Sequence, residues 1–137
     1  MKHLLAIIAF IITTFAVQGL SHFVINKDHF ASIEFMRDSP IMPLGFAVMV
    51  IQGLILSLAL STTSPGTVTV SSAYKRVFAF GLFLGSYIVL TEPAKYAAPS
   101  LPAWMMVEGT ASFVQFALFG VVLWGIHAGH DRWHKRP

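Results

Sequence analysis

The sequence contains no cysteine and few charged residues, and these two absences limit what the protein can be. Without cysteine there are no disulfides, no thiolate metal sites, no covalently attached haem and no cysteine nucleophile. Charged residues make up 11% of the 137 positions, whereas a soluble domain usually carries about 25%. The hydrophobic share of 55% is more than a small soluble domain can bury. The chain therefore belongs in lipid, where about 20 residues per crossing allow three or four spans.

The basic residues are scattered along the chain. Nine Lys and Arg against six Asp and Glu give a formal charge of +3. A nucleic-acid-binding protein would gather such residues into a stripe. Here they stand singly or in pairs beside apolar runs, so we expect no nucleic-acid partner and read them as signals of membrane topology.

Four apolar runs predict an all-α, integral membrane four-helix bundle, a single transmembrane domain over residues 1–137. The predicted spans are residues 4–25, 40–60, 77–97 and 103–126. The first run also resembles a secretory signal peptide, but it is longer than the roughly 7–15 apolar residues of such a signal, so we expect a retained helix. Pro93 should bend or end the third span, because proline removes a backbone donor.

Polar segments connect and follow these spans. Residues 26–39 carry Phe30, Ile33 and Met36 at helical spacing, which predicts a short interfacial amphipathic helix. Residues 61–73 have the small-residue composition of a loop. Residues 127–137 are predicted to be a polar tail.

The polar tail contains several histidines. His127, His130 and His134 share a face if the last helix continues, so they are candidate metal ligands, with a basic tail bound to solvent or lipid headgroups as the alternative. The sequence identifies no cofactor. His3 and His29 look like isolated surface residues.

Lys and Arg are divided unevenly between the two sides of the predicted bundle. The side of the termini holds Lys2, Lys75, Arg76, Arg132, Lys135 and Arg136, and the other side holds Lys27, Arg37 and Lys95. Since short cytoplasmic segments carry the excess of positive charge, we expect both termini in the cytoplasm. The layout of four short helices, with the longest polar link after the first, is similar to that of several small bacterial inner-membrane families. This resemblance implies a multi-pass protein of the plasma (inner) membrane.

Polar residues inside the predicted spans gather at similar depths, from the outer surface to the middle of the membrane. They are Gln18, His22, Gln52, Glu92, Lys95, Glu108, Ser112 and Gln115. Glu108, Ser112 and Gln115 share a helix face because they are spaced i, i+4, i+7. Such residues are costly in lipid, so they should face the bundle interior and pair. We therefore predict a polar pocket that opens outward, where His22, Glu92 and Glu108 converge above the glutamines.

Structural alternatives exist for most of these residues. Glu92 and Lys95 are three residues apart and are also consistent with an interfacial ion pair. Glu108 lies four residues after Trp104 and is also consistent with a solvated side chain at headgroup level. The glutamines are also suited to hydrogen bonds between helices.

Small residues mark close helix contacts. Gly81 with Gly85, and Gly53 with Ser57, have the spacing that lets two helices approach closely. This approach would serve either the fold or a homo-oligomer.

The leading functional hypothesis is a protein that binds a small or lipidic ligand in the outer polar pocket. One alternative is an accessory or assembly subunit that docks onto a larger membrane complex through the Gly81 and Gly85 face and the amphipathic segment. Another is a membrane enzyme acting on a lipid or isoprenoid, with Glu92 or Glu108 as general acid or base and His22 as its partner. The same three groups are also suited to a divalent cation.

Overall fold

Helices make up almost all of the computed structural model, which describes residues 1–35, 37, 39–63 and 68–134, with residues 63 and 134 as backbone alone. The long helices are α1 (Lys2–Leu20), α3 (Met42–Thr63), α4 (Val70–Ser86) and α6 (Leu101–His134). The short ones are α2 (Lys27–Ala31), α5 (Glu92–Lys95) and the π-helical turns η1 (Ser21–Ile25) and η2 (Tyr87–Thr91). The described residues form no strand, and the predicted all-α fold is confirmed.

Four stretches are long and apolar enough to cross a membrane. They are Lys2–Ile25, Met42–Thr62, Val70–Lys95 and Leu101–Trp133. Each has at least the roughly 20 residues needed to cross the hydrocarbon core as a helix. The chain is therefore a multi-pass membrane protein, as predicted.

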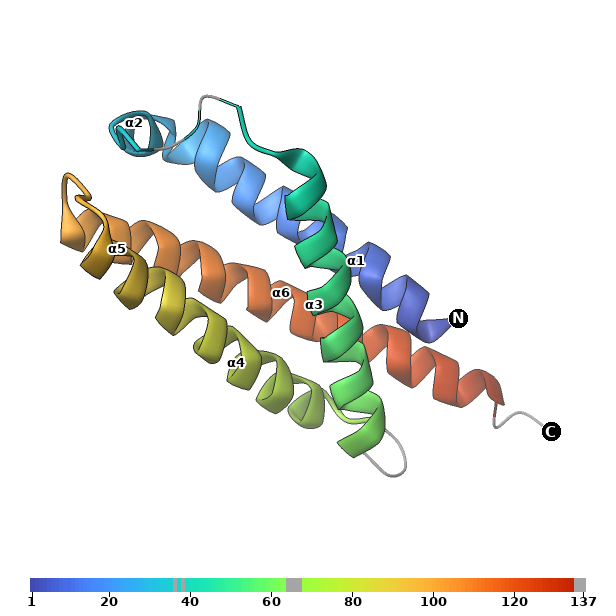
Figure 1. Ribbon diagram of the computed structural model, residues 1–137. Coiled ribbons are helices and arrows are strands. Elements are labelled where there is room, and N and C mark those ends of the chain that lie inside the picture. The colour runs from blue at the N-terminus through green and yellow to red at the C-terminus, as the bar shows by residue number, and fades with distance from the viewer. Residues whose placement is uncertain (36, 38, 64–67, 135–137) are drawn as a thin grey trace.

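The helices are arranged around a central pair, α1 and α6 (Figure 1). α1 packs against α3 on one side and α6 on the other, and α6 also packs against α4. α1, α4 and α6 lie side by side, whereas α3 crosses them obliquely. Both chain ends lie at one end of the bundle, which we call the terminal end. α2 and α5 lie at the opposite end, which we call the capped end.

The apolar core lies between the four long helices, and aromatic rings fill its centre. Phe10 of α1 and Phe119 of α6 are fully buried, with ring centroids 4.8 Å apart in an edge-to-face arrangement. Leu56 and Leu60 of α3 and Val77 of α4 complete the core from the outer helices. Most other apolar side chains of α3 are exposed, as expected for a helix that faces lipid.

Two glycines let neighbouring helices approach closely. A Cβ atom on Gly53 would lie 3.0 Å from Ile7 Cα, so α3 needs glycine here to pack against α1. A Cβ atom on Gly81 would lie 2.7 Å from Phe116 Cγ, so α4 needs glycine to pack against α6. The fold itself therefore occupies the small-residue faces that the sequence analysis singled out.

The predicted loop over residues 61–73 is wrong at both ends. α3 continues to Thr63, and α4 begins at Val70 rather than near residue 77. Thr69 Oγ1 accepts a hydrogen bond from the Ser72 N–H at 3.1 Å, and the Thr69 N–H donates to Ser72 Oγ at 3.1 Å. This capping box satisfies backbone donors that a helix start leaves unpaired. The helix therefore starts earlier in the chain than predicted. Residues 64–67 lie outside the described part of the chain.

The predicted polar tail is also wrong for most of its length, because α6 continues to His134. Gly129 costs a helix about 1 kcal/mol relative to alanine, but the neighbouring His127 and Ala128 are buried and hold the helix in place. At 1.5 Å per residue, the 34 residues of α6 extend for roughly 51 Å. The helix is therefore longer than the hydrocarbon core, which is about 30 Å thick.

Pro93 ends the third span, as predicted, and a π-helical turn lies shortly before it in the chain. η2 ends at Thr91, two residues before the proline, and α5 stops at Lys95. The proline ring would clash with the carbonyl of Val89 in a regular α-helix, and the wider π turn relieves this clash. η1 ends the first span at the same end of the bundle, where the Asn26 N–H donates to the Ser21 carbonyl at 2.8 Å.

The segment after the first span closes the capped end. Its helix is α2, and the apolar residues Phe30 and Ile33 are buried against Trp104 of α6. Met36 lies outside the described residues. The expectation for His29 is wrong, because its half-buried ring lies 6.4 Å from the Trp104 ring. A helix is therefore present in this segment and covers the bundle, but it is five residues long and ends before Ile33, so it is shorter than the spacing of Phe30, Ile33 and Met36 predicts.

Candidate functional site

The polar residues of α6 lie on its buried face, as their spacing predicts. Glu108, Ser112 and Gln115 are between 5% and 8% exposed. Gln115 Oε1 accepts a hydrogen bond from Gln18 Nε2 at 2.8 Å, and Gln115 Nε2 donates to Thr14 Oγ1 at 3.0 Å. These bonds join α1 to α6 through the bundle interior. Gln18 and Gln115 thus have the interhelical role that the sequence analysis considered for the glutamines.

His22 makes its contacts within its own end of the bundle. Its Nδ1 atom lies 2.9 Å from the Gln18 carbonyl oxygen, and its ring stacks on Phe30 with centroids 3.7 Å apart. Within the described ranges, no hydrogen bond or ion pair joins His22 to Glu92 or Glu108. The structure therefore does not bring the three predicted ionisable groups into one bonded cluster.

The two glutamates do lie near each other at the capped end. Glu108 is 6% exposed, which contradicts the alternative of a solvated side chain. Glu92 directly follows η2, and Trp104, one turn before Glu108 on α6, donates its Nε1 hydrogen to the Ile88 carbonyl of η2 at 3.0 Å. Lys95 does not form the expected ion pair with Glu92, since its Nζ atom donates to Tyr87 Oη at 3.1 Å. Two acidic groups therefore share this end of the bundle, and Glu108 has no hydrogen bond or ion pair with any other described residue.

Gln52 is the remaining predicted site residue. It is half-buried on α3, one residue before the close contact at Gly53. Its side chain has no hydrogen bond within the described part of the chain. The structure does not place it with the other polar residues.

A groove of about 460 Å³ lies between α4, η2 and α6. Glycines Gly81, Gly85 and Gly109 line it, so backbone stands where side chains would otherwise fill the space. Its α4 and η2 side runs from Phe78 to Leu90, which corresponds to roughly 18 Å at 1.5 Å per residue. The groove is therefore long and narrow rather than round.

The walls of this groove are apolar, and its two ends differ. At the terminal end, the rings of Phe78 and Phe113 lie 5.6 Å apart. At the other end the groove reaches Val89 and Gly109, next to the two glutamates in the sequence. Of the eight predicted site residues, only Ser112 lines it. The groove is therefore apolar, and it is a different feature from the polar pocket that the sequence predicts.

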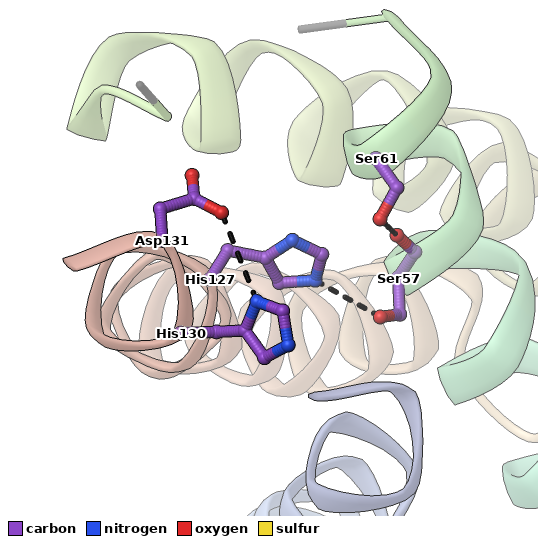
Figure 2. A network of polar contacts seen from close by, with 5 residues as sticks. All are labelled: Ser57, Ser61, His127, His130 and Asp131. Atoms are coloured by element: carbon purple, nitrogen blue, oxygen red, sulfur yellow. Dashed lines mark hydrogen bonds and ion pairs between the residues drawn. The ribbon is translucent and has the colours of Figure 1, made fainter. Parts of the chain in front are cut away.

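A second polar cluster lies at the terminal end, and the sequence analysis missed it. Ser57 Oγ lies 2.9 Å from His3 Nδ1 and 2.9 Å from His127 Nε2, so one hydroxyl joins α1, α3 and α6. Figure 2 shows His127 reaching from α6 to Ser57 on α3. Ser57 and His127 are 0% and 1% exposed. The expectation that His3 is an isolated surface residue is therefore wrong.

The histidines of the former tail do not form a metal site with the rest of the described chain. Nowhere in those ranges do three or more His, Asp or Glu side chains gather in a way that could hold a metal ion. His127 binds Ser57, and His130 Nδ1 lies 3.9 Å from Asp131 Oδ1 (Figure 2). The side chain of His134 lies outside the described residues.

Comparisons with protein-family models, with curated proteins and with solved structures find no match. Function therefore has to follow from three features of the molecule itself. These are the apolar groove, the acidic pair beside its capped end and the buried cluster at the terminal end.

Proposed function

We propose that this membrane protein binds a lipidic ligand whose apolar chain lies in the groove between α4, η2 and α6. The observation that carries the proposal is the groove itself. Its volume of about 460 Å³ falls within the roughly 300–1,000 Å³ of typical ligand sites. Its length of roughly 18 Å suits an extended hydrocarbon chain better than a compact solute.

The walls of the groove favour a ligand that comes from the bilayer. The rim residues Leu82 and Phe113 are 75% and 64% exposed, so in a membrane they meet lipid. Among the described residues that line the groove, only Ser86 and Ser112 carry polar side chains, and both are hydroxyl groups. An apolar chain loses little free energy when it moves from the bilayer into such a site, whereas a polar solute would lose its hydration.

The proposed setting is the plasma (inner) membrane, with both termini in the cytoplasm. In the sequence, six Lys and Arg residues belong to the side of the termini and three to the other side, and this imbalance supports the orientation. In this orientation the η2 end of the groove faces the outer side, and Glu92 and Glu108 lie close in the sequence to its lining residues Leu90 and Gly109. A ligand of the outer leaflet would enter with its chain directed toward Phe78.

Photo-crosslinking with a filled groove tests the proposal. The probe is a phospholipid with a photoactivatable diazirine in its acyl chain, reconstituted with the protein in vesicles. Ser86→Phe places a ring in the groove, whereas Ala79→Phe places the same ring on an exposed part of α4 that does not line it. Crosslinks to Leu82 and Phe113 should fall several-fold in Ser86→Phe and stay at the wild-type level in Ala79→Phe.

The opposite result is equally clear. Crosslinks spread evenly over all lipid-facing helices, including Leu44 and Ile51 of α3, would mean that the groove holds no preferred ligand. Unchanged labelling of Leu82 in Ser86→Phe would have the same meaning.

A further inference from the structure

A carboxyl group without a bonding partner lies beside the capped end of the groove. Glu108 is 6% exposed, and its side chain forms no hydrogen bond or ion pair with another described residue. An ionisable group at this depth is costly unless a partner compensates its charge. The described chain supplies no such partner, so the carboxyl group points to a ligand.

Glu108 and Glu92 border the same end of the groove. Glu108 directly precedes Gly109, and Glu92 follows Val89 by three residues; Gly109 and Val89 both line the groove. Glu92 directly follows η2, and η2 packs against the start of α6, because Trp104 Nε1 donates to the Ile88 carbonyl at 3.0 Å, so the two carboxyl groups share one neighbourhood. Two like charges in a medium of low dielectric repel each other strongly, and a cation between them removes that repulsion.

Among the described residues, no Lys or Arg side chain forms an ion pair with Glu92 or Glu108. Lys95 is the basic residue of the same short helix as Glu92, and it donates to Tyr87. The wider charge pattern points the same way. Within the described ranges, the capped end carries four acidic residues against three basic ones, whereas the terminal end carries one acidic residue against four basic ones. The acidic residues of the capped end are Asp28, Glu34, Glu92 and Glu108, and that of the terminal end is Asp131.

We propose that the ligand carries an ammonium group, which pairs with Glu108 and Glu92 while the apolar chain occupies the groove. This inference rests on the proposed function and names the class of its ligand. A primary ammonium has three donors and no acceptor, so one group can bond both carboxylates at once. This chemistry is found in a phospholipid with an ethanolamine headgroup and in a free long-chain amine.

Competition between two phospholipids tests the headgroup. Phosphatidylethanolamine and phosphatidylglycerol with identical acyl chains are offered in equal amounts in mixed micelles, and native mass spectrometry measures which one the protein retains. The wild-type protein should retain the ethanolamine lipid about tenfold more, the effect expected of one charge-assisted hydrogen bond. Glu108→Gln, which keeps the shape and removes the charge, should bring the ratio close to one.

Matched variants separate this effect from a general loss of acidity or of fold. Glu34→Gln removes an exposed acid from the same end of the bundle and should keep the wild-type ratio. Glu92→Gln is the second test variant and lowers the ratio even if Glu108→Gln fails to fold. Dodecylamine added as a competitor identifies the source of the ammonium group. If it displaces the ethanolamine lipid, a free long-chain amine is sufficient for binding. If it does not compete, the ligand is the phospholipid.

The outcomes for headgroup and groove are distinct. Equal retention of the two lipids by the wild-type protein overturns the ammonium proposal, and so does an unchanged ratio in both glutamine variants. Ser86→Phe should abolish retention of both lipids whatever the headgroup. If Ser86→Phe retains them as the wild-type protein does, the groove proposal fails independently of Glu108.

Discussion

Replacement of Ser57 by alanine is expected to weaken the bundle more than any other loss of a single hydroxyl group. The Ser57 hydroxyl joins three helices, because it lies 2.9 Å from both His3 Nδ1 and His127 Nε2. It has one proton, so it donates to one imidazole and accepts from the other. Ser57→Ala removes both bonds and leaves two histidine nitrogens on different helices without their partner.

The expected cost follows from how well each histidine can recover. His127 is 1% exposed, and its Nδ1 atom already lacks a partner among the described residues. Leaving its Nε2 atom unpaired as well costs about 1–3 kcal/mol. His3 is half-buried, and a hydrogen bond between membrane helices is worth about 0.6 kcal/mol on average. The total of about 1.6–3.6 kcal/mol corresponds to a shift of roughly 15- to 450-fold in the unfolding equilibrium.

Unfolding in mixed micelles by a denaturing detergent, followed by circular dichroism, measures this loss. Ser61→Ala is the matched control, because Ser61 Oγ donates only to the Ser57 carbonyl of its own helix at 3.0 Å (Figure 2). That control should change the free energy of unfolding by less than about 0.5 kcal/mol. If Ser57→Ala and Ser61→Ala unfold alike, the hydroxyl does not join the helices and the reasoning is wrong.

Two further predictions concern packing and topology. Gly81→Ala should destabilise the bundle by about 1–3 kcal/mol, since its Cβ atom would lie 2.7 Å from Phe116 Cγ; Gly125→Ala, which meets nothing within 4 Å, should be neutral or slightly stabilising in the same unfolding assay. The chain lacks cysteine, so single cysteines report its orientation: in intact cells a membrane-impermeant maleimide should label Ala97→Cys and spare Ser71→Cys, and the reverse pattern would contradict cytoplasmic termini.

The number and type of spans could be predicted from the sequence because lipid imposes a length on every apolar run. The ends of the helices could not, because they depend on single local interactions. Thr69 and Ser72 start α4 through a capping box, and the burial of His127 carries α6 past Gly129. Neither effect appears in an average over composition, which treats both stretches as polar and flexible.

The candidate site shows the same limit in three dimensions. Helical spacing correctly placed Glu108, Ser112 and Gln115 on one face, because that relation lies within one helix. The bond from Gln18 to Gln115 depends on α1 and α6 being neighbours, which a single sequence does not state. His3, Ser57 and His127 lie at a similar depth on the terminal side of the membrane. Comparing the depths of polar residues on that side of the sequence would group them as well.

The central place of α6 has a consequence for the biogenesis of the protein. α6 is the last of the four spans in chain order, yet it packs between α1 and α4. While the chain is synthesised, α1 and α3 enter the bilayer first, with Gln18 and Ser57 already in place but without their partners on α6. Arrival of the last helix pairs these groups and joins the two sides of the molecule. Assembly is therefore completed by polar docking of a late helix, and the groove exists only after that step.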